Sequence, residues 1–293
     1  MKKRFVSAAL AAVMALSMTA CGSSNSAAET TAADTEAAES QAEETTAEEA
    51  KTTDGGTLIV GFDQDFPPMG FVGDDGEYTG FDLELAEAVC EIYGWKLVKT
   101  PINWDAKDTE LNSGAIDCIW NGFTMNGRED DYTWSDPYVD NSQVMVVSEN
   151  SGINSLSDLA GKTVGVQAAS AALDLLQSEE EGGQKELADT FVALQQFPDY
   201  NNAFVELQAG SIDAVAMDIG VAKYQLESRG EGYKILDEYL NSEKYAIGFK
   251  KGNTELCDKV NEGLQQVLAD GTFDKLAEKY GIADMVCLEK KGE

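Results

Sequence analysis

Residues 191–218, FVALQQFPDYNNAFVELQAGSIDAVAMD, predict a strand, a helix and a second strand in close succession. The first strand is expected over residues 191–197 and the second over residues 213–217. Between them, Phe204 and Leu207 are three residues apart, so both side chains lie on one face of a helix. Two strands joined by a helix predict a parallel pair with the helix packed across it. The stretch therefore predicts an α/β fold.

The same alternation of strands and helices extends along the chain on both sides of this stretch. Further strands are expected at residues 58–60, 96–100, 117–120, 163–167 and 245–249. Further helices are expected at residues 81–92, 109–111, 170–177, 218–224, 256–268 and 273–280. The pattern predicts two α/β units in tandem, each with a mainly parallel sheet.

The last strand and two helices are too few to enclose a core of their own. We therefore expect them to pack on the first unit, so that the chain crosses between units near residues 144–148 and 242–245. Two crossings form a hinge, and the cleft beside a hinge commonly holds a ligand. The predicted boundaries are residues 56–147 plus 243–293 for lobe 1 and 148–242 for lobe 2.

Residues 1–20 are typical of a secretory signal peptide. A basic start over residues 2–4 precedes an apolar run over residues 5–18, which is too short to span a bilayer comfortably. Residues 18–22, MTACG, resemble the lipobox of bacterial lipoproteins, which implies lipid attachment at Cys21. A secreted protein with an incidental cysteine is the alternative.

Residues 21–55 consist almost entirely of alanine, serine, threonine and acidic residues. Such a segment buries too little apolar surface to offset the entropy of ordering it, so we expect a disordered, acidic tether. With the lipid as the anchor, the folded part is expected at the extracytoplasmic face of the bacterial cell membrane.

The composition excludes several classes of function. The chain has 53 acidic and 21 basic residues, a formal net charge of −32, which opposes binding to nucleic acid or anionic lipid. Histidine is absent, which excludes histidine-based nucleophile systems and histidine-ligated metal. We expect no cofactor and no metal, while a carboxylate- or lysine-based enzyme stays possible.

Four cysteines follow Cys21. Cys90 falls on the apolar face of a predicted helix and Cys118 in a predicted strand, so both are expected to be buried free thiols. Cys257 and Cys287 flank the last helices, and the sequence leaves open whether they form a disulfide.

Six segments in order resemble one known family, the bacterial extracellular solute-binding proteins of family 3 that bind polar amino acids. They are GFDQDFPPMGF (61–71), YTGFDLELAEAV (78–89), NGFTMNGRE (121–129) with WSDPY (134–138), LAGKTVGVQAAS (159–170), QQFPDYNNAFVELQAGSIDAVAMD (195–218) and YAIGFKKG (245–252). The likeness covers residues 57–282. Within the family, the chain is similar to glutamine- and lysine/arginine/ornithine-binding proteins.

The resemblance implies a periplasmic-binding-protein-like type II fold, with two α/β lobes, a two-strand hinge and a ligand cleft between the lobes. It also implies a monomer that binds a free polar amino acid (basic, amide or cystine-like). The ligand would pass to the transmembrane subunits of an ABC permease, whose ATPase is a separate subunit.

The resemblance also implies which residues bind the ligand's charged groups. Arg128 would bind the carboxylate, with a surface ion pair to Glu129 or Asp130 as the alternative. Ser170, at a helix N-terminus, would assist from the other lobe. Asp218 would bind the ammonium, with helix capping as its alternative.

Further ligand contacts are implied around these three. Phe66 and Trp104 would be aromatic walls, although aromatic residues more often fill cores. The carbonyl of Gly122 and the hydroxyl of Thr124 would contact the ammonium and carboxylate. Asp63 and Asn121 match positions at the end of the ligand's side chain, and Gln167 is a further binding position, where the glutamine-binding proteins have a lysine.

The chain departs from the family pattern at two places. One residue fewer separates Thr124 from Arg128, which leaves the loop path open, and Ala168 and Ala169 stand where the family commonly has glycine. The aromatic walls and Asp63 slightly favour a cationic ligand.

Two other functions remain as alternatives. Some dehydratases of aromatic acid precursors share this fold, and Asp63 would then be the proton donor. The protein could instead present its ligand to a signalling receptor.

Overall fold

The structure is a computed structural model that describes residues 56–291. These residues belong to a unit of residues 47–293. The signal peptide (1–20), Cys21 and the tether (21–55) lie outside the described residues. Within residues 56–291, no helix combines the length and the apolar composition that crossing a membrane requires.

Lobe 1 is built on a five-stranded sheet in the order β5-β1-β6-β15-β7. Its strands are β1 (Thr57–Phe62), β5 (Lys96–Pro101), β6 (Cys118–Ile119), β7 (Tyr132–Trp134) and β15 (Gly248–Lys250). Strand β1 is parallel to β5 and β6, whereas β15 is antiparallel to β6 and β7. The C-terminal strand therefore returns to the first sheet, as the sequence predicts.

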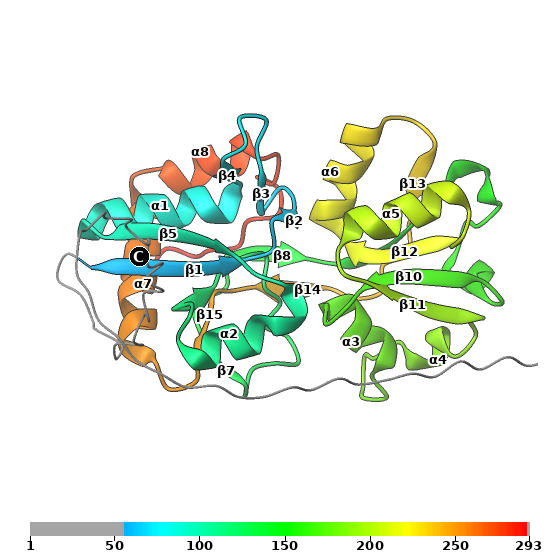
Figure 1. Ribbon diagram of the computed structural model, residues 1–293, viewed down its shortest axis with the longest axis horizontal. Helices are drawn as coiled ribbons and strands as arrows, with labels where there is room; N and C mark the ends of the chain where they lie inside the picture. Colours follow the sequence, from blue (N-terminus) through cyan, green and yellow to red (C-terminus); the bar gives the residue numbers. More distant parts are fainter. Residues whose placement is uncertain (1–55, 292–293) are drawn as a thin grey trace, which may run out of the picture. The chain divides into compact units, whose positions relative to one another are not determined.

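Four helices belong to this lobe. They are α1 (Phe81–Tyr93), α2 (Lys107–Ser113), α7 (Thr254–Ala269) and α8 (Thr272–Lys279). Helix α1 contacts both α7 and α8, and in Figure 1 α1 and α8 lie above the sheet while α7 runs down the left edge of the lobe. Gly94 ends α1 in the left-handed conformation that favours glycine. A small sheet beside α1, which the sequence analysis did not predict, contains β2 (Asp65–Phe66), β3 (Gly70–Val72) and β4 (Tyr78–Thr79).

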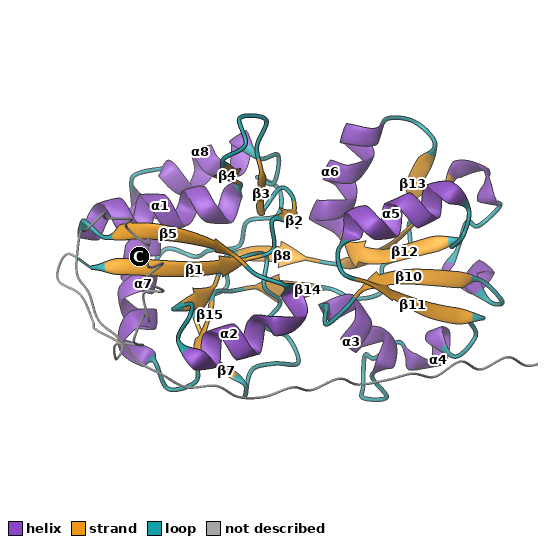
Figure 2. Cartoon of the chain, viewed as in Figure 1, coloured by secondary structure: helices purple, strands orange, loops and turns teal. Residues whose placement is uncertain are grey.

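Lobe 2 has a five-stranded sheet in the order β11-β10-β12-β9-β13, shown in Figure 2. Its strands are β9 (Gln143–Ser148), β10 (Thr163–Gln167), β11 (Ala193–Phe197), β12 (Ala214–Asp218) and β13 (Tyr233–Ile235). Its helices are α3 (Ala171–Gln177), α4 (Lys185–Ala188), α5 (Tyr200–Ala209) and α6 (Ile219–Arg229). Strand β10 is parallel to β11 and β12, and β9 is antiparallel to β12. Both sheets are thus mixed, with a parallel part that matches the predicted strand–helix alternation.

The hinge is a two-stranded antiparallel sheet of β8 (Val139–Asn141) and β14 (Glu243–Tyr245). The second crossing is in the predicted segment, but the first is earlier than residues 144–148. Strand β9 already pairs with β12 of lobe 2, so we place the boundary near Ser142 rather than after residue 147. The apolar run of β9 is buried on both faces, and its sequence carries no periodicity that could assign it to either lobe.

All four cysteines of the described residues are free thiols. Cys90 and Cys118 are buried, as expected from the sequence. The sulfur of Cys257 lies 3.1 Å from the carbonyl oxygen of Trp134, and Cys287 is half-buried. The possible disulfide between Cys257 and Cys287 is therefore not formed in this structure.

Candidate functional site

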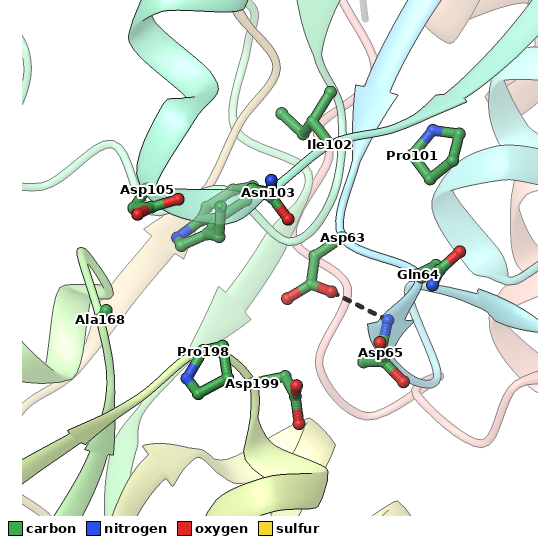
Figure 3. Close-up of a pocket in the computed structure, with 11 residues that line it drawn as sticks. Asp63, Gln64, Asp65, Pro101, Ile102, Asn103, Asp105, Ala168, Pro198 and Asp199 are labelled. Carbon is green, nitrogen blue, oxygen red and sulfur yellow. Dashed lines mark hydrogen bonds between the residues drawn. The ribbon is translucent and has the colours of Figure 1, made fainter. Parts of the chain in front are cut away.

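A cavity of about 360 Å³ lies between the two lobes and is strongly acidic. Lobe 1 contributes a run of residues after β1 and another after β5, and lobe 2 contributes the residues that follow β10 and β11. The lining residues are Asp63, Gln64, Asp65, Pro101, Ile102, Asn103, Trp104, Asp105, Ala168, Pro198 and Asp199. Four of them are aspartates and none is basic. Figure 3 shows the Asp63 carboxylate pointing into the space between Asn103 and Asp105 on one side and Pro198 and Asp199 on the other.

Asp63 is the buried charge of this cavity, with 6% of its surface exposed. One carboxylate oxygen accepts a hydrogen bond from the Asp65 backbone N–H at 2.9 Å. The other accepts one from the Gln167 side-chain amide, across the cleft, at 2.7 Å. Burial raises the pKa of Asp63 to about 6, and the charges of Asp65 and Asp199 add to that effect. The site therefore favours a positive group beside Asp63.

The two predicted aromatic walls differ in their surroundings. Trp104, in a short 3₁₀ helix (Trp104–Ala106), lines the acidic cavity and packs edge-on against Phe123 at a ring distance of 5.5 Å. Phe66 is not among the residues that line this cavity. Its ring packs against that of Tyr200 at 6.0 Å. Trp104 is thus in position to contact a ligand in the cavity, whereas Phe66 fills the seam between the lobes.

A second cavity of about 690 Å³ lies between the lobes and contains the cations of the cleft. Arg128 pairs there with Asp174 of α3, with 2.6 Å between the guanidinium nitrogen and the carboxylate oxygen. The partner is a residue of the facing lobe, and neither of the expected neighbours Glu129 and Asp130. Lys107, only 5% exposed, donates to the Ala169 carbonyl across the cleft at 3.2 Å. Both of the lobe 1 cations that line this cavity therefore contact lobe 2.

Asp218 lies at the end of β12 and is fully enclosed. It occupies the N-cap position of α6, but its side chain makes no capping hydrogen bond. Its carboxylate instead accepts hydrogen bonds from four side chains, at 2.7 to 3.2 Å: Asn141, Gln143, Tyr200 and Tyr245. Burial and the neighbouring charge of Glu243 raise the pKa of Asp218 to about 6. The Asp218 side chain therefore does not cap α6 in this structure.

Thr124 and Ser170 are held in position by neighbouring groups. The Thr124 hydroxyl donates to the Glu243 carboxylate at 2.7 Å. The Ser170 hydroxyl accepts from the Leu173 N–H at 3.1 Å, which caps α3, and donates to the Gln167 carbonyl at 2.8 Å. Ala169 beside it has a φ of 54°, the left-handed conformation that explains the glycine of related sequences.

Gly122 and Asn121 lie in the first lobe beneath Phe66. Gly122 has a φ of 54°, and a Cβ there would approach the Phe66 ring within 2.9 Å, so the position requires glycine. The Asn121 side chain is 1% exposed, and neither its nitrogen nor its oxygen has a hydrogen-bond partner among the described residues.

Comparison with known proteins assigns the family. Residues 58–283 match the model of the bacterial extracellular solute-binding proteins, family 3. The chain belongs to this family. Its fold is that of the type II periplasmic binding proteins, as the six sequence segments imply.

Relatives and solved structures of family 3 proteins cover most of the chain. The L-cystine-binding protein TcyJ of Escherichia coli K12 is 30% identical over 80% of this chain and 86% of its own length. The arginine-binding extracellular protein ArtP of Bacillus subtilis is 29% identical over 95% of this chain and 98% of its own length. An ABC uptake transporter substrate-binding protein of Streptococcus pneumoniae, solved with bound histidine, is 35% identical with a TM-score of 0.74. The alignment covers 79% of this chain and 95% of that one. These family 3 relatives bind amino acids.

Several residues of the candidate site were not identified from the sequence. Asp174 and Lys107 lie on the short helices α3 and α2, and nothing in their local sequence points to the facing lobe. Glu243 lies in the segment correctly identified as the second crossing, but a single charged residue in a short strand gave no reason to single it out. Asp199, which caps α5 by accepting from the Asn202 N–H, also lines the acidic cavity and was not identified as a site residue.

Proposed function

We propose that this chain binds a free amino acid with a cationic side chain in the cleft and delivers it to an ABC permease. The observation that carries the proposal is the cavity beside Asp63, which has four aspartates from two lobes and no basic residue. A buried carboxylate without a cation is unfavourable, so a ligand cation there would be strongly stabilised.

The proposed pose assigns a group to each pole of the ligand. The cationic side chain lies beside Asp63 and against the Trp104 ring, where charge pairing and cation–π attraction act together. The ligand's carboxylate replaces Asp174 as the partner of the Arg128 guanidinium. Ser170, at the start of α3, also binds this carboxylate. The ammonium lies at Asp218. The proposal also keeps four further residues near the ligand: Asn121, Gly122, Thr124 and Phe66, the last at the seam beside the acidic cavity and not in its lining.

Selectivity follows from the charge of the cavity lining. An arginine, lysine or protonated histidine side chain offers one positive charge to a set of carboxylates. Cystine would bring a second carboxylate as well as a second ammonium, and the lining has no basic residue to pair with it. A basic amino acid therefore fits this chain better than cystine does.

Binding is coupled to lobe closure in this proposal. Because Asp63 and Arg128 belong to lobe 1 and Asp218 belongs to lobe 2, a ligand that contacts all three favours the closed form. The closed form of a monomer, anchored through a lipid at Cys21 on the outer side of the cytoplasmic membrane, would then dock on the permease.

A binding role is preferred to a catalytic one for this chain. A dehydratase-like mechanism would need a carboxylic acid that donates a proton in the cleft, and Asp63, with its raised pKa, is the candidate. However, Asp63 already accepts two hydrogen bonds and is surrounded by other aspartates, an arrangement that suits the binding of a cation. Presentation of the ligand to a signalling receptor would use the same site.

Isothermal titration of the full-length chain with L-arginine, L-lysine, L-histidine, L-glutamine, L-glutamate and L-cystine tests the proposal. We expect 1:1 binding of at least one basic amino acid. Glutamate should bind at least roughly 100-fold more weakly than that basic amino acid, because its side-chain carboxylate would lie among aspartates. Tightest binding of glutamate or glutamine would refute the cationic assignment, and absence of binding by every amino acid would refute the function.

A further inference from the structure

Glu243 is a buried carboxylate of the hinge. It begins β14, the second hinge strand, and is 4% exposed. One of its oxygens accepts the Thr124 hydroxyl at 2.7 Å, and the other accepts the Asn241 amide at 3.1 Å. No surface position explains the charge, so it needs a partner inside the protein.

Glu243 and Asp218 are held by the same two amide groups. The side-chain nitrogen of Asn141 lies 2.8 Å from an oxygen of each carboxylate. The nitrogen of Gln143 lies 2.7 Å from the Asp218 oxygen and 2.8 Å from the Glu243 oxygen. Two acceptors that share two donors must lie close to each other. The hinge thus brings a carboxylate of β14 against a carboxylate of lobe 2.

Neither carboxylate has a cation of the protein as partner. Within residues 56–291, no ion pair includes Asp218 or Glu243. Arg128 reaches the Thr124 carbonyl at 3.4 Å, but its charge is paired with Asp174. Lys244 turns outward to Asp140 at 2.7 Å.

The other groups that face the pair are uncharged donors. Tyr200 of α5 and Tyr245 of β14 both donate to Asp218, and burial raises their pKa values further above the ordinary range. In addition, the side-chain oxygens of Asn141 and Gln143 are buried without a partner among the described residues. Two buried like charges with unused acceptors beside them are unfavourable without a cation.

We propose that Glu243 is the second carboxylate of the ammonium subsite, so that the α-ammonium of the ligand lies between Asp218 and Glu243. In the empty cleft a proton on Asp218 takes the place of that cation, and it passes to solvent when the ammonium enters. The inference rests on the proposed function and deepens it, because it assigns the ammonium a residue of the hinge itself.

A pH dependence of ligand affinity follows from this arrangement. The pKa of Asp218, raised to about 6, means that Asp218 carries a proton in more of the molecules as the pH falls below 6. The bound ammonium favours the charged carboxylate, so binding releases the proton in that range. The Asp218 proton should therefore make affinity rise with pH up to about 6 by at most about tenfold per pH unit, and the proton on Asp63, whose pKa is also about 6, adds a similar contribution.

The variant Glu243→Gln in the full-length chain tests the assignment with two probes: L-arginine and the arginine analogue that lacks the α-amino group. We expect the variant to lower the affinity for L-arginine roughly 30-fold or more and to change the affinity for the analogue by no more than about threefold. Asp140→Asn is the matched control, because it removes an exposed carboxylate from the facing hinge strand. It should leave both affinities within about twofold.

Three outcomes of this experiment decide between the claims. An equal loss for both probes would mean that Glu243 only supports the fold, and no loss for L-arginine would remove it from the subsite. If the wild-type chain binds none of the basic amino acids, the proposed function fails, and the carboxylate pair is then tested in the empty protein. In the empty protein, a carboxyl ¹³C NMR titration should show a carboxyl group that titrates near pH 6, and its titration midpoint should be lower in Glu243→Gln. An unchanged midpoint would overturn the pairing.

Discussion

In the proposed function, ligand selectivity depends on Asp63. Its carboxylate is nearly inaccessible to solvent, yet its charge meets only hydrogen-bond donors and other aspartates. Burial without a neighbouring cation raises the pKa of Asp63. In the proposed function, a cationic ligand supplies the missing positive charge and gains binding energy from it.

Replacing Asp63 with Asn should therefore separate charge from shape. The amide has the same size and keeps one acceptor, so we expect the fold to persist and the affinity for L-arginine to fall roughly 100-fold or more. Isothermal titration measures the change. Asp274→Asn on exposed α8 is the control and should bind as the wild type does; equal affinities in Asp63→Asn and the wild type would argue against the acidic cavity as the side-chain site.

The sequence predicted the site residues unevenly. Asp63 and Trp104 were implied by the family resemblance and both line the acidic cavity, and Gln167, implied in the same way, contacts Asp63. Asp174 and Glu243 were not identified, because their roles depend on how the two lobes and the hinge meet. Such contacts join residues far apart in the chain and leave no local pattern.

At the scale of elements, local rules located most helices and strands. Gly94 ends α1, Asp199 begins α5, and Ser170 begins α3, each as its residue type predicts. Strand β9 was assigned to the crossing because its apolar run has no alternation of polar and apolar residues that would indicate which sheet it joins. The two- and three-residue strands of β2–β4 are too short for any periodicity to appear.

Helix α1 carries a buried carboxylate that should control how stability depends on pH. Asp82 is fully buried and accepts hydrogen bonds from the Tyr138 hydroxyl and the Gly122 N–H. Burial raises the pKa of Asp82 from its ordinary 3.8 to about 7. Between these values the folded state holds a proton that the unfolded chain releases, so the free energy of unfolding falls as pH rises from about 4 to about 7.

The variant Asp82→Asn should remove that contribution. We expect the slope of unfolding free energy against pH, measured by urea denaturation between about pH 5 and pH 7, to become less negative by about 1 kcal/mol per pH unit. Glu87→Gln on the exposed face of the same helix should leave the slope unchanged. An Asp82→Asn slope equal to that of the wild type would mean that Asp82 is charged throughout this range.

At the scale of the whole described unit, the two lobes already touch through polar side chains. Asp63 bonds Gln167, Arg128 bonds Asp174, and Asp65 accepts from Asn201 at 2.9 Å. These contacts occupy the groups that the ligand would use. A ligand must therefore replace contacts within the cleft, and its net affinity is the difference between the two sets.

A crystal structure of the chain with its tightest-binding amino acid tests the central claim most directly. The account predicts one ligand between the lobes, with its side-chain cation beside Asp63, its carboxylate on Arg128, and its ammonium between Asp218 and Glu243. A ligand bound outside the cleft, or one whose side chain points away from Asp63, would contradict it.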